Sequence, residues 1–325
     1  MTATPNPLPS KLSGVTIRAV QEHELPAVDR IFRLAFGTFL GLPDPMKFSG
    51  DADFIRTRWL ADPSAVIGAE LDGELVGTNL ATRWGSVGFF GPLTIRPDLW
   101  NKGIAQLLMG PTMELFNEWG VRHAGLFTFA SSAKHVGLYQ KFGFWPRFLT
   151  ALMEKPIGTE STSTQWTRFS ALSGPEKQAC LEACRELTSS IFEGLDLVRE
   201  ILAVDVQRLG DTLLTWSGSQ LVGLAVCHEG PGTEAGTGKC YIKFGCARGG
   251  PGAAREFRRL LNACREFGLS MDANTLVAGV NLARLDAYRE MLQAGFRTMT
   301  QGVAMQRNSD PGYNRPEVFV MDDWR

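Results

Sequence analysis

The feature that most constrains the fold is an order of turns, strands and helices that occurs twice in the chain. Three pairs of segments carry it: 71–77 with 216–223, 119–120 with 267–268, and 142–144 with 294–296. The members of each pair are about 150 residues apart, and chance matches of single glycines would not be expected to keep so constant a spacing. The repetition predicts a tandem duplication of one α/β domain.

The boundaries of the two copies follow from composition. A chain of 325 residues exceeds the usual size of one domain. Residues 156–165 are rich in Ser, Thr, Gly and Pro and offer almost nothing to bury, which is typical of a linker. We therefore expect a loose N-terminal arm over 1–13, a first domain over 14–155 and a second domain over 166–325.

Periodicity predicts a mixed, mostly antiparallel sheet flanked by helices in each copy, an α/β (α+β) fold. In the first copy, Asp72-Gly73 suits the left-handed positions of a tight hairpin turn. The segments expected in strands are 14–20, 65–71, 75–82, 85–95, 124–130 and 144–153, and those expected in helices are 22–36, 52–60, 103–119 and 133–142. Pro111 is expected to bend the third of these helices.

Charge and composition exclude several classes of partner. The chain has 33 basic and 34 acidic residues, and no Lys/Arg run is long enough to bind nucleic acid or anionic lipid. It has no leader-like N-terminus and no uncharged apolar run of membrane-spanning length, which indicates a cytoplasmic protein without a membrane partner. The six cysteines lie in the second copy without Cys-x-x-Cys spacing, so we expect buried free thiols and no metal.

Residues 93–108 carry the clearest chemistry. A strand, a short loop and the start of a helix follow one another, and the loop tightens at Gly103. N–H groups in the first turn of a helix have no partner within the helix, and the helix dipole adds partial positive charge there. Gly103 also lacks the Cβ that would keep a phosphate away from the main chain. The segment therefore suits an anion, although a purely structural glycine at a strand-to-helix turn explains the same residue.

The same segment resembles the cofactor loop of the GNAT acetyltransferase superfamily, which reads Arg/Gln-x-x-Gly-x-Gly/Ala after a strand ending in Leu-x-Val-x-Pro. Arg96-Pro97-Asp98, Gly103 and Ala105 match that order. The resemblance continues through the meander before the loop and through residues 139–144 after it, but Trp100 stands where the family loop begins with Arg or Gln. The resemblance implies acetyl-CoA as the cofactor, with its pyrophosphate held mainly by main-chain N–H groups.

The resemblance also implies which residues contact the cofactor. The strand before the loop would pair through its main chain with the pantetheine arm, a form of strand addition, and Gly91-Pro92 suits a bulge in that strand. Ser132 lies where the family often has Asn near pantetheine, and it could instead cap the helix that begins near Ala133. The expected cofactor residues are Leu93, Thr94, Ile95, Asn101, Lys102, Gly103, Ile104, Ala105, Gln106 and Ser132.

Tyr139 is the expected catalytic residue. It lies four positions before Gly143, where the family carries its general acid. A phenol with an ordinary pKa of about 10 stays protonated at neutral pH and can give a proton to the departing thiolate. A single tyrosine on an amphipathic helix is also typical of a hydrophobic core, so the acid role depends on the resemblance.

No general base is evident. The family commonly projects a carboxylate from the two strands beside the cofactor, but neither 85–95 nor 124–130 contains Asp or Glu. The loop 36–45 lies where the family shapes its acceptor site, and its aromatic residues favour an acceptor with an apolar part or, equally, a Phe-rich core. The remaining candidates for the base are Asp44, His123, His135 and a carboxylate from the second copy.

The second copy is expected to be degenerate and to lack the cofactor site. Its loop 248–254 has Pro251 where a main-chain N–H would be needed, and Met291 stands at the position of the acid. Tyr288, one turn earlier, is the alternative acid of this copy. The strand-like segment 318–321 is expected to cross back toward the first domain.

These features predict an N-acetyltransferase that moves an acetyl group from acetyl-CoA to an amine of a small molecule or peptide. Two rivals remain. One is an acyl-CoA sensor or scaffold without turnover, and the other is an enzyme with different chemistry on the thioester, such as transfer of another acyl group or decarboxylation. The sequence leaves open the acceptor, the general base and whether the protein forms a homodimer.

Overall fold

The computed structural model describes residues 13–158 and 164–325. The expected arm, apart from Ser13, and the centre of the expected linker lie outside the described residues. The first half contains β1 (Thr16–Ala19), α1 (Leu25–Phe39), α2 (Ile55–Ala61), β2 (Val66–Leu71), β3 (Glu74–Trp84), β4 (Val87–Ile95), α3 (Ile104–Glu118), β5 (His123–Thr128), α4 (Ala133–Gln140) and β6 (Phe144–Pro156).

The second half repeats much of this order. It contains β7 (Thr167–Arg168), α5 (Gly174–Ile191), α6 (Val198–Gln207), β8 (Gly210–Ser217), β9 (Gln220–Gly230), β10 (Gly236–Ala247), α7 (Ala253–Ser270), β11 (Thr275–Asn281), α8 (Leu285–Gln293), β12 (Arg297–Arg307) and β13 (Val320–Met321). The fold is α/β, with the same order of strands and helices in both halves.

The local predictions for the first half are confirmed, with element ends shifted by at most about three residues. Asp72 and Gly73 form the turn between β2 and β3 and have φ angles of 53° and 82°. Pro111 lies inside α3 without ending it, and Gly120 follows that helix with a φ of 65°. Turn and cap chemistry therefore set these elements locally.

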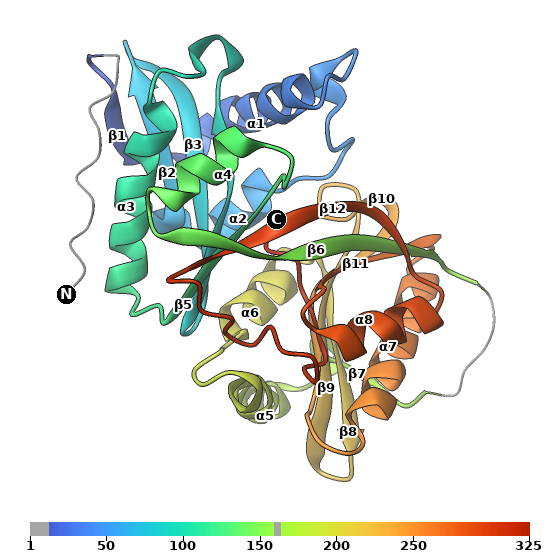
Figure 1. The fold of residues 1–325 in the computed structure, drawn as a ribbon. Helices are drawn as coiled ribbons and strands as arrows, with labels where there is room; N and C mark the ends of the chain where they lie inside the picture. The colour runs from blue at the N-terminus through green and yellow to red at the C-terminus, as the bar shows by residue number, and fades with distance from the viewer. Residues whose placement is uncertain (1–12, 159–163) are drawn as a thin grey trace.

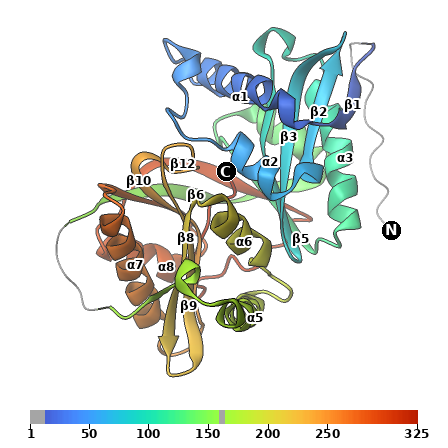
Figure 2. The ribbon, with the colours of Figure 1, turned by 180° about the vertical axis from the view of Figure 1, so that it is seen from behind.

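All strands belong to one sheet, in the order β1-β2-β3-β4-β5-β12-β6-β11-β10-β9-β8-β7, with β13 added to β10. The sixth strand of each half therefore lies in the other half: β12 pairs with β5, and β6 pairs with β11. The two exchanged strands also pair antiparallel with each other along most of their length. They run side by side between the first-half and second-half elements in both views (Figures 1 and 2).

The exchange has a direct physical consequence. Main-chain N–H and C=O groups in a sheet interior must find partners, and here β5 and β11 find one set of partners on a strand from the other half. The sheet of the first half is therefore completed by β12, and that of the second half by β6.

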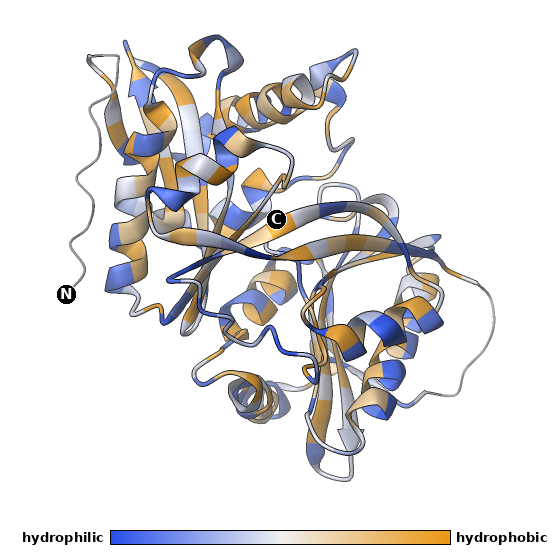
Figure 3. Cartoon of the chain, viewed as in Figure 1, coloured by the Kyte–Doolittle hydropathy of each residue, from blue (hydrophilic) through white to orange (hydrophobic). Residues whose placement is uncertain are grey.

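Helices cover both faces of the second-half sheet. Neighbouring residues of β8 point to opposite sides, because Leu214 belongs to the core under α5 and α6, whereas Leu213 belongs to the core under α7. Hydrophilic and hydrophobic residues accordingly alternate around α7 and α8 (Figure 3). All six cysteines are buried and free, as the sequence predicted. Among the described residues, no helix is long and apolar enough to cross a membrane.

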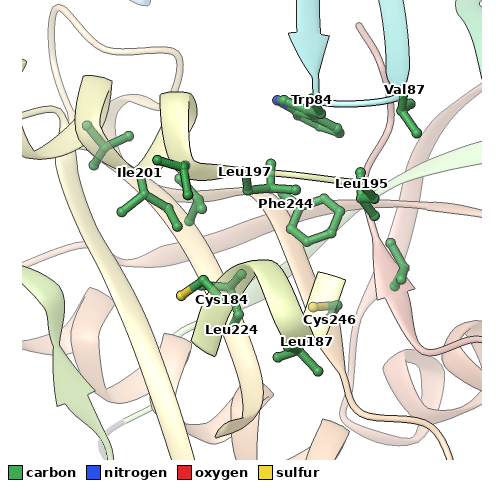
Figure 4. Close-up of a cluster of buried hydrophobic side chains, with 14 of the residues drawn as sticks. Trp84, Val87, Cys184, Leu187, Leu195, Leu197, Ile201, Leu224, Phe244 and Cys246 are labelled. Carbon is green, nitrogen blue, oxygen red and sulfur yellow. The ribbon is translucent and has the colours of Figure 1, made fainter. Parts of the chain in front are cut away.

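One hydrophobic core joins the two halves. Trp84 and Val87, at the turn between β3 and β4, pack among side chains of α5, α6, β9 and β10 (Figure 4). The Trp84 ring lies edge to face with Phe244 of β10 at a centroid distance of 5.3 Å. Both side chains are almost fully buried, so the halves share apolar surface as well as strands.

This shared core generates the first prediction. Phe244→Ala should lower the free energy of unfolding by about 3–5 kcal/mol, because it removes a fully buried ring and leaves a cavity. Since the same cluster and the exchanged strands connect both halves, amide exchange in β3 and β9 should rise together. Measurement by hydrogen–deuterium exchange and denaturant titration tests this. Faster exchange in β9 with an unchanged β3 would contradict a single cooperative unit.

Candidate active site

The site begins where β4 and β5 part. These strands pair in parallel only from Val87 with His123 to Phe89 with Gly125. Beyond that point β5 continues against β12, while β4 keeps only β3 as its partner among the described strands. The C-terminal half of β4 thus presents a main-chain edge toward the end of β5.

A bulge at Gly91-Pro92 turns β4 at this point. The peptide bond between the two residues is cis, and Gly91 has a φ of 148°. The register with β3 shifts between the pairs Ala81–Phe90 and Asn79–Leu93. The interruption that the sequence predicted is therefore present, and the Arg58 side chain fixes it by donating a hydrogen bond of 2.7 Å to the Gly91 carbonyl.

Register decides which of the three predicted strand residues can offer main-chain groups to a ligand. Arg96 N–H donates to the Val76 carbonyl of β3 at 2.8 Å. Because hydrogen-bonding directions alternate along an antiparallel strand, Thr94 also faces β3, and Leu93 and Ile95 face the opposite edge. The buried Thr94 hydroxyl is hydrogen-bonded to Thr78 at 3.1 Å. The main-chain N–H and C=O groups of Leu93 and Ile95 therefore point to the open edge of β4. Those of Thr94 point to β3, within the sheet.

The predicted loop and helix start lie next to this edge. Asn101 and Gly103 have φ angles of 65° and 90°, and α3 begins at Ile104 without a side-chain cap. Gly103 is the left-handed position here, so a residue with a Cβ would be strained. The Ile104 side chain is 1% exposed and packs in the core beside Leu108, so only its main chain can reach a ligand. The side chains of Lys102, Ala105 and Gln106 are partly exposed, and that of Asn101 is exposed.

Trp100 has a role that the sequence did not reveal. Its indole N–H donates a hydrogen bond of 2.8 Å to the Ile95 carbonyl, which faces the β4 edge. The Lys134 ammonium, at the start of α4, lies 5.5 Å from the centre of the indole ring. The residue that departs from the family pattern thus ties the loop to β4 and competes with any ligand for the Ile95 carbonyl.

Tyr139 lies in the hydrophobic core beside β4. Its side chain is 7% exposed, and its ring packs edge to face on Phe90 of β4 at 5.6 Å. The Thr128 side chain, at the end of β5, lies near its hydroxyl. Burial raises the pKa of the Tyr139 phenol far above its ordinary value, although Thr128 opposes the shift. The phenol is therefore a protonated group held beside the place where β4 and β5 part.

Ser132 acts as a helix cap. Its hydroxyl accepts a hydrogen bond from the His135 N–H at 3.4 Å at the start of α4.

The His135 ring lies 5.0 Å from Phe39, whose ring lies 4.9 Å from that of Phe129 after β5. Burial, and then the Lys134 charge, lower the pKa of His135. The predicted acceptor loop thus contributes Phe39 to an aromatic surface at the end of β5.

The candidates for a general base are placed less favourably. Asp44 caps a short helical turn by accepting the Met46 N–H at 3.1 Å. His123 starts β5, at the end where β4 and β5 are still paired, and burial lowers its pKa to about 4. The structure therefore places His123 away from the site.

A buried carboxylate of the second half reaches the β4 bulge through Arg58. Glu234, in the loop between β9 and β10, forms a bidentate ion pair with Arg58 at 2.7 and 3.0 Å and a further pair with Lys243 at 2.7 Å. Burial alone would raise the pKa of Glu234, but the Arg58 and Lys243 charges hold it well below its usual range. Glu234 stays ionised and paired. Sequence reasoning missed this contact because the partners are far apart in the chain and carry no motif.

Known proteins resemble this chain in part of its sequence and in its fold. Residues 28–144 match the model of the acetyltransferase (GNAT) family. No curated protein matches the sequence. A putative acetyltransferase from Pyrococcus horikoshii has a TM-score of 0.70 at 15% identity, covering 96% of each chain. A GCN5-related N-acetyltransferase from Sphaerobacter thermophilus has a TM-score of 0.59 at 16% identity, covering 94% of this chain and 98% of that one.

N-myristoyltransferase from Saccharomyces cerevisiae, solved with myristoyl-CoA, has a TM-score of 0.62 at 10% identity and covers 94% of this chain and 82% of that chain. Identities this low show a shared fold, and the fold extends over both halves. Residues 28–144 therefore match the acetyltransferase (GNAT) family, and the fold around them is shared with acetyltransferase structures over both halves of the chain.

Proposed function

We propose that the first half binds an acyl-CoA where β4 and β5 part and transfers its acyl group to an amine. The observation that carries this proposal is the main-chain edge of Leu93 and Ile95, which lies directly before a left-handed glycine loop and the start of α3. A pantetheine arm has amide groups that can pair with such an edge. A pyrophosphate suits the N–H groups of a helix start.

The cofactor contacts are proposed in two groups. Residues 101–106 surround the pyrophosphate, where main-chain N–H groups and the helix dipole each favour negative charge by about 0.3–1 kcal/mol at an exposed site. Leu93 and Ile95 pair with the pantetheine arm. Thr94 and Ser132 support the site indirectly, because the Thr94 hydroxyl bonds Thr78 within the sheet and Ser132 caps α4, the helix that carries Tyr139.

The proposed chemistry is direct attack. The amine nitrogen attacks the thioester carbonyl carbon, a C–N bond forms, and the nitrogen releases a proton to solvent. The C–S bond breaks when the tetrahedral intermediate collapses. The thiolate then takes the proton of the Tyr139 hydroxyl, and the phenolate regains a proton from solvent, which balances the proton released by the amine. The acyl group is proposed to be acetyl, and the acceptor an amine of a small molecule or peptide, with an apolar part that suits Phe39 and Phe129.

The rival without turnover has its own supporting observation. Neither β4 nor β5 carries a carboxylate, and Trp100 already uses the Ile95 carbonyl. An acyl-CoA-binding protein would keep the β4 edge and need no base. Release of free coenzyme A over a panel of amines separates the two, and mass spectrometry of the acyl-CoA products detects other thioester chemistry.

The loop is tested by Gly103→Val. A Cβ at this left-handed position strains the loop and meets the bound phosphate, so affinity for acetyl-CoA should fall at least tenfold by calorimetry, a loss of about 1.4 kcal/mol. Gly73→Val is the matched control, because Gly73 has a similar φ of 82° in the hairpin turn, with open space around its Cβ position. Equal affinities in the two variants would place the pyrophosphate elsewhere.

The acid is tested by Tyr139→Phe, which keeps the ring in the core and removes only the hydroxyl. The turnover number should fall at least tenfold while acetyl-CoA affinity stays within about twofold. Tyr288→Phe removes the alternative acid of the second half and should leave turnover unchanged. The reverse result, with loss only in the Tyr288 variant, would move the active site to the second half.

The pH dependence follows from the burial of Tyr139. An acid must be protonated to act, and the pKa of this phenol is raised by burial. Turnover should therefore not decline on the alkaline side between about pH 7 and pH 10, the ordinary phenol value. A descending limb within that range that disappears in Tyr139→Phe would mean that the phenol ionises normally and is not buried in the active protein.

A further inference from the structure

The second half contains the counterpart of the β4 edge. Strand β10 starts parallel to β11, with four pairs from Lys239–Thr275 to Ile242–Ala278. The rest of β10 then pairs with β13 instead of β11: Gly245 lies opposite Met321, and Cys246 lies opposite Val320. A strand from the chain's own tail therefore occupies the edge that, in β4, has no strand partner among the described residues.

The two edges correspond residue by residue. Arg248 N–H donates to the Val222 carbonyl at 2.8 Å, as Arg96 donates to Val76 at the same distance. Ala247 lies opposite Gly223 in the sheet, as Ile95 lies opposite Gly77. Thus Ala247 is the counterpart of Ile95, and Gly245 is the counterpart of Leu93.

The tail pairs with Gly245 and Ala247, the counterparts of the two first-half residues that we assign to pantetheine. Ala247 N–H donates to the Phe319 carbonyl at 3.0 Å, and Gly245 is paired with Met321. Both β10 residues therefore direct their main chains to β13.

The tail is firmly held in this position. At Gly245 an added Cβ would lie 2.6 Å from the Met321 methyl carbon, so the glycine lets Met321 sit flat on the strand. Arg284 is 1% exposed and donates to the Val320 carbonyl at 3.1 Å and to the Asp322 carboxylate at 2.8 Å. Residues 318–324 are all buried.

We propose that β13 takes, in the second half, the place of a pantetheine arm, so that the chain itself fills the second cofactor edge and only the first half binds acyl-CoA. The inference rests on the proposed function, in which Leu93 and Ile95 receive the cofactor. The degenerate sequence already argues against a cofactor site in the second copy. The occupied edge adds a physical reason, because a ligand at Ala247 would have to displace a paired and buried strand.

The same tail reaches the first site. Trp324 packs against Gly125 and stacks on Phe89 at a centroid distance of 6.2 Å, and these two residues form the last pair before β4 and β5 part. The tail that pairs with the β10 edge therefore also packs against the place where the β4 edge begins.

A disulfide that locks the tail tests the inference. Since Ala247 and Phe319 form a hydrogen-bonded pair, Cys246 and Val320 form the adjacent non-hydrogen-bonded pair, with Cα atoms about 4.5 Å apart, a separation that suits a disulfide. Val320→Cys therefore places a thiol opposite the native Cys246. Loss of two free thiols on oxidation verifies the bond, and Val318→Cys, which does not face Cys246 in this register, is the matched control.

Acetyl-CoA binding to the full chain should show a stoichiometry near one, with affinity unchanged within about twofold between the reduced and oxidised Val320→Cys protein. In wild type, hydrogen–deuterium exchange should slow at 93–95 on addition of acetyl-CoA and stay unchanged at 245–247. Binding that disappears only in the oxidised protein, a second bound coenzyme, or new protection at 245–247 would overturn the inference. Absence of binding in wild type would instead overturn the proposed function.

Discussion

The structure depends on the antiparallel pairing of β6 with β12. Each strand closes the half of the molecule to which it does not belong in sequence, so the main-chain hydrogen bonds of β5 and β11 can be satisfied only when both halves are folded together. This constraint places β9, β10 and the tail against the first half, and it explains why one core contains Trp84 from β3 and Phe244 from β10. The second half is a structural part of the first site rather than an appended domain.

Buried charge at this junction connects the halves more specifically. Arg58 is 6% exposed and lies between Glu234 of the second half and the Gly91 carbonyl of β4. Lys243 joins Glu234 to Glu200, which also accepts the Trp84 indole N–H at 3.2 Å. Removal of one partner from a buried ion pair typically costs about 3–5 kcal/mol, because the other charge is left unpaired. The network therefore holds the bulge that directs Leu93 and Ile95 outward, and it couples the geometry of the proposed cofactor edge to the second half.

The two halves illustrate how one strand edge can have two uses. In β4 the edge lies beside a left-handed loop, a helix start and a protonated phenol, which together suit a thioester. In β10 the equivalent positions are a glycine and an alanine covered by β13. An unpaired strand edge is costly when buried and prone to unwanted association when exposed, so a copy without a ligand needs another partner, and the tail provides it.

The sequence by itself determined the features that depend on near neighbours: the Asp72-Gly73 turn, the Gly91-Pro92 interruption, the left-handed Gly103 before α3, the strand-like segment at 318–321 and the duplicated order of elements. These follow from local dihedral preferences and hydrophobic period, which a few adjacent residues specify. Only the tertiary structure decided the exchange of β6 and β12, the Arg58–Glu234 pair, the inward direction of Thr94, the capping role of Ser132 and the partner of β13. Those outcomes depend on which distant strands share hydrogen bonds and in what register, and a one-residue change of register reverses the direction of every side chain and peptide group.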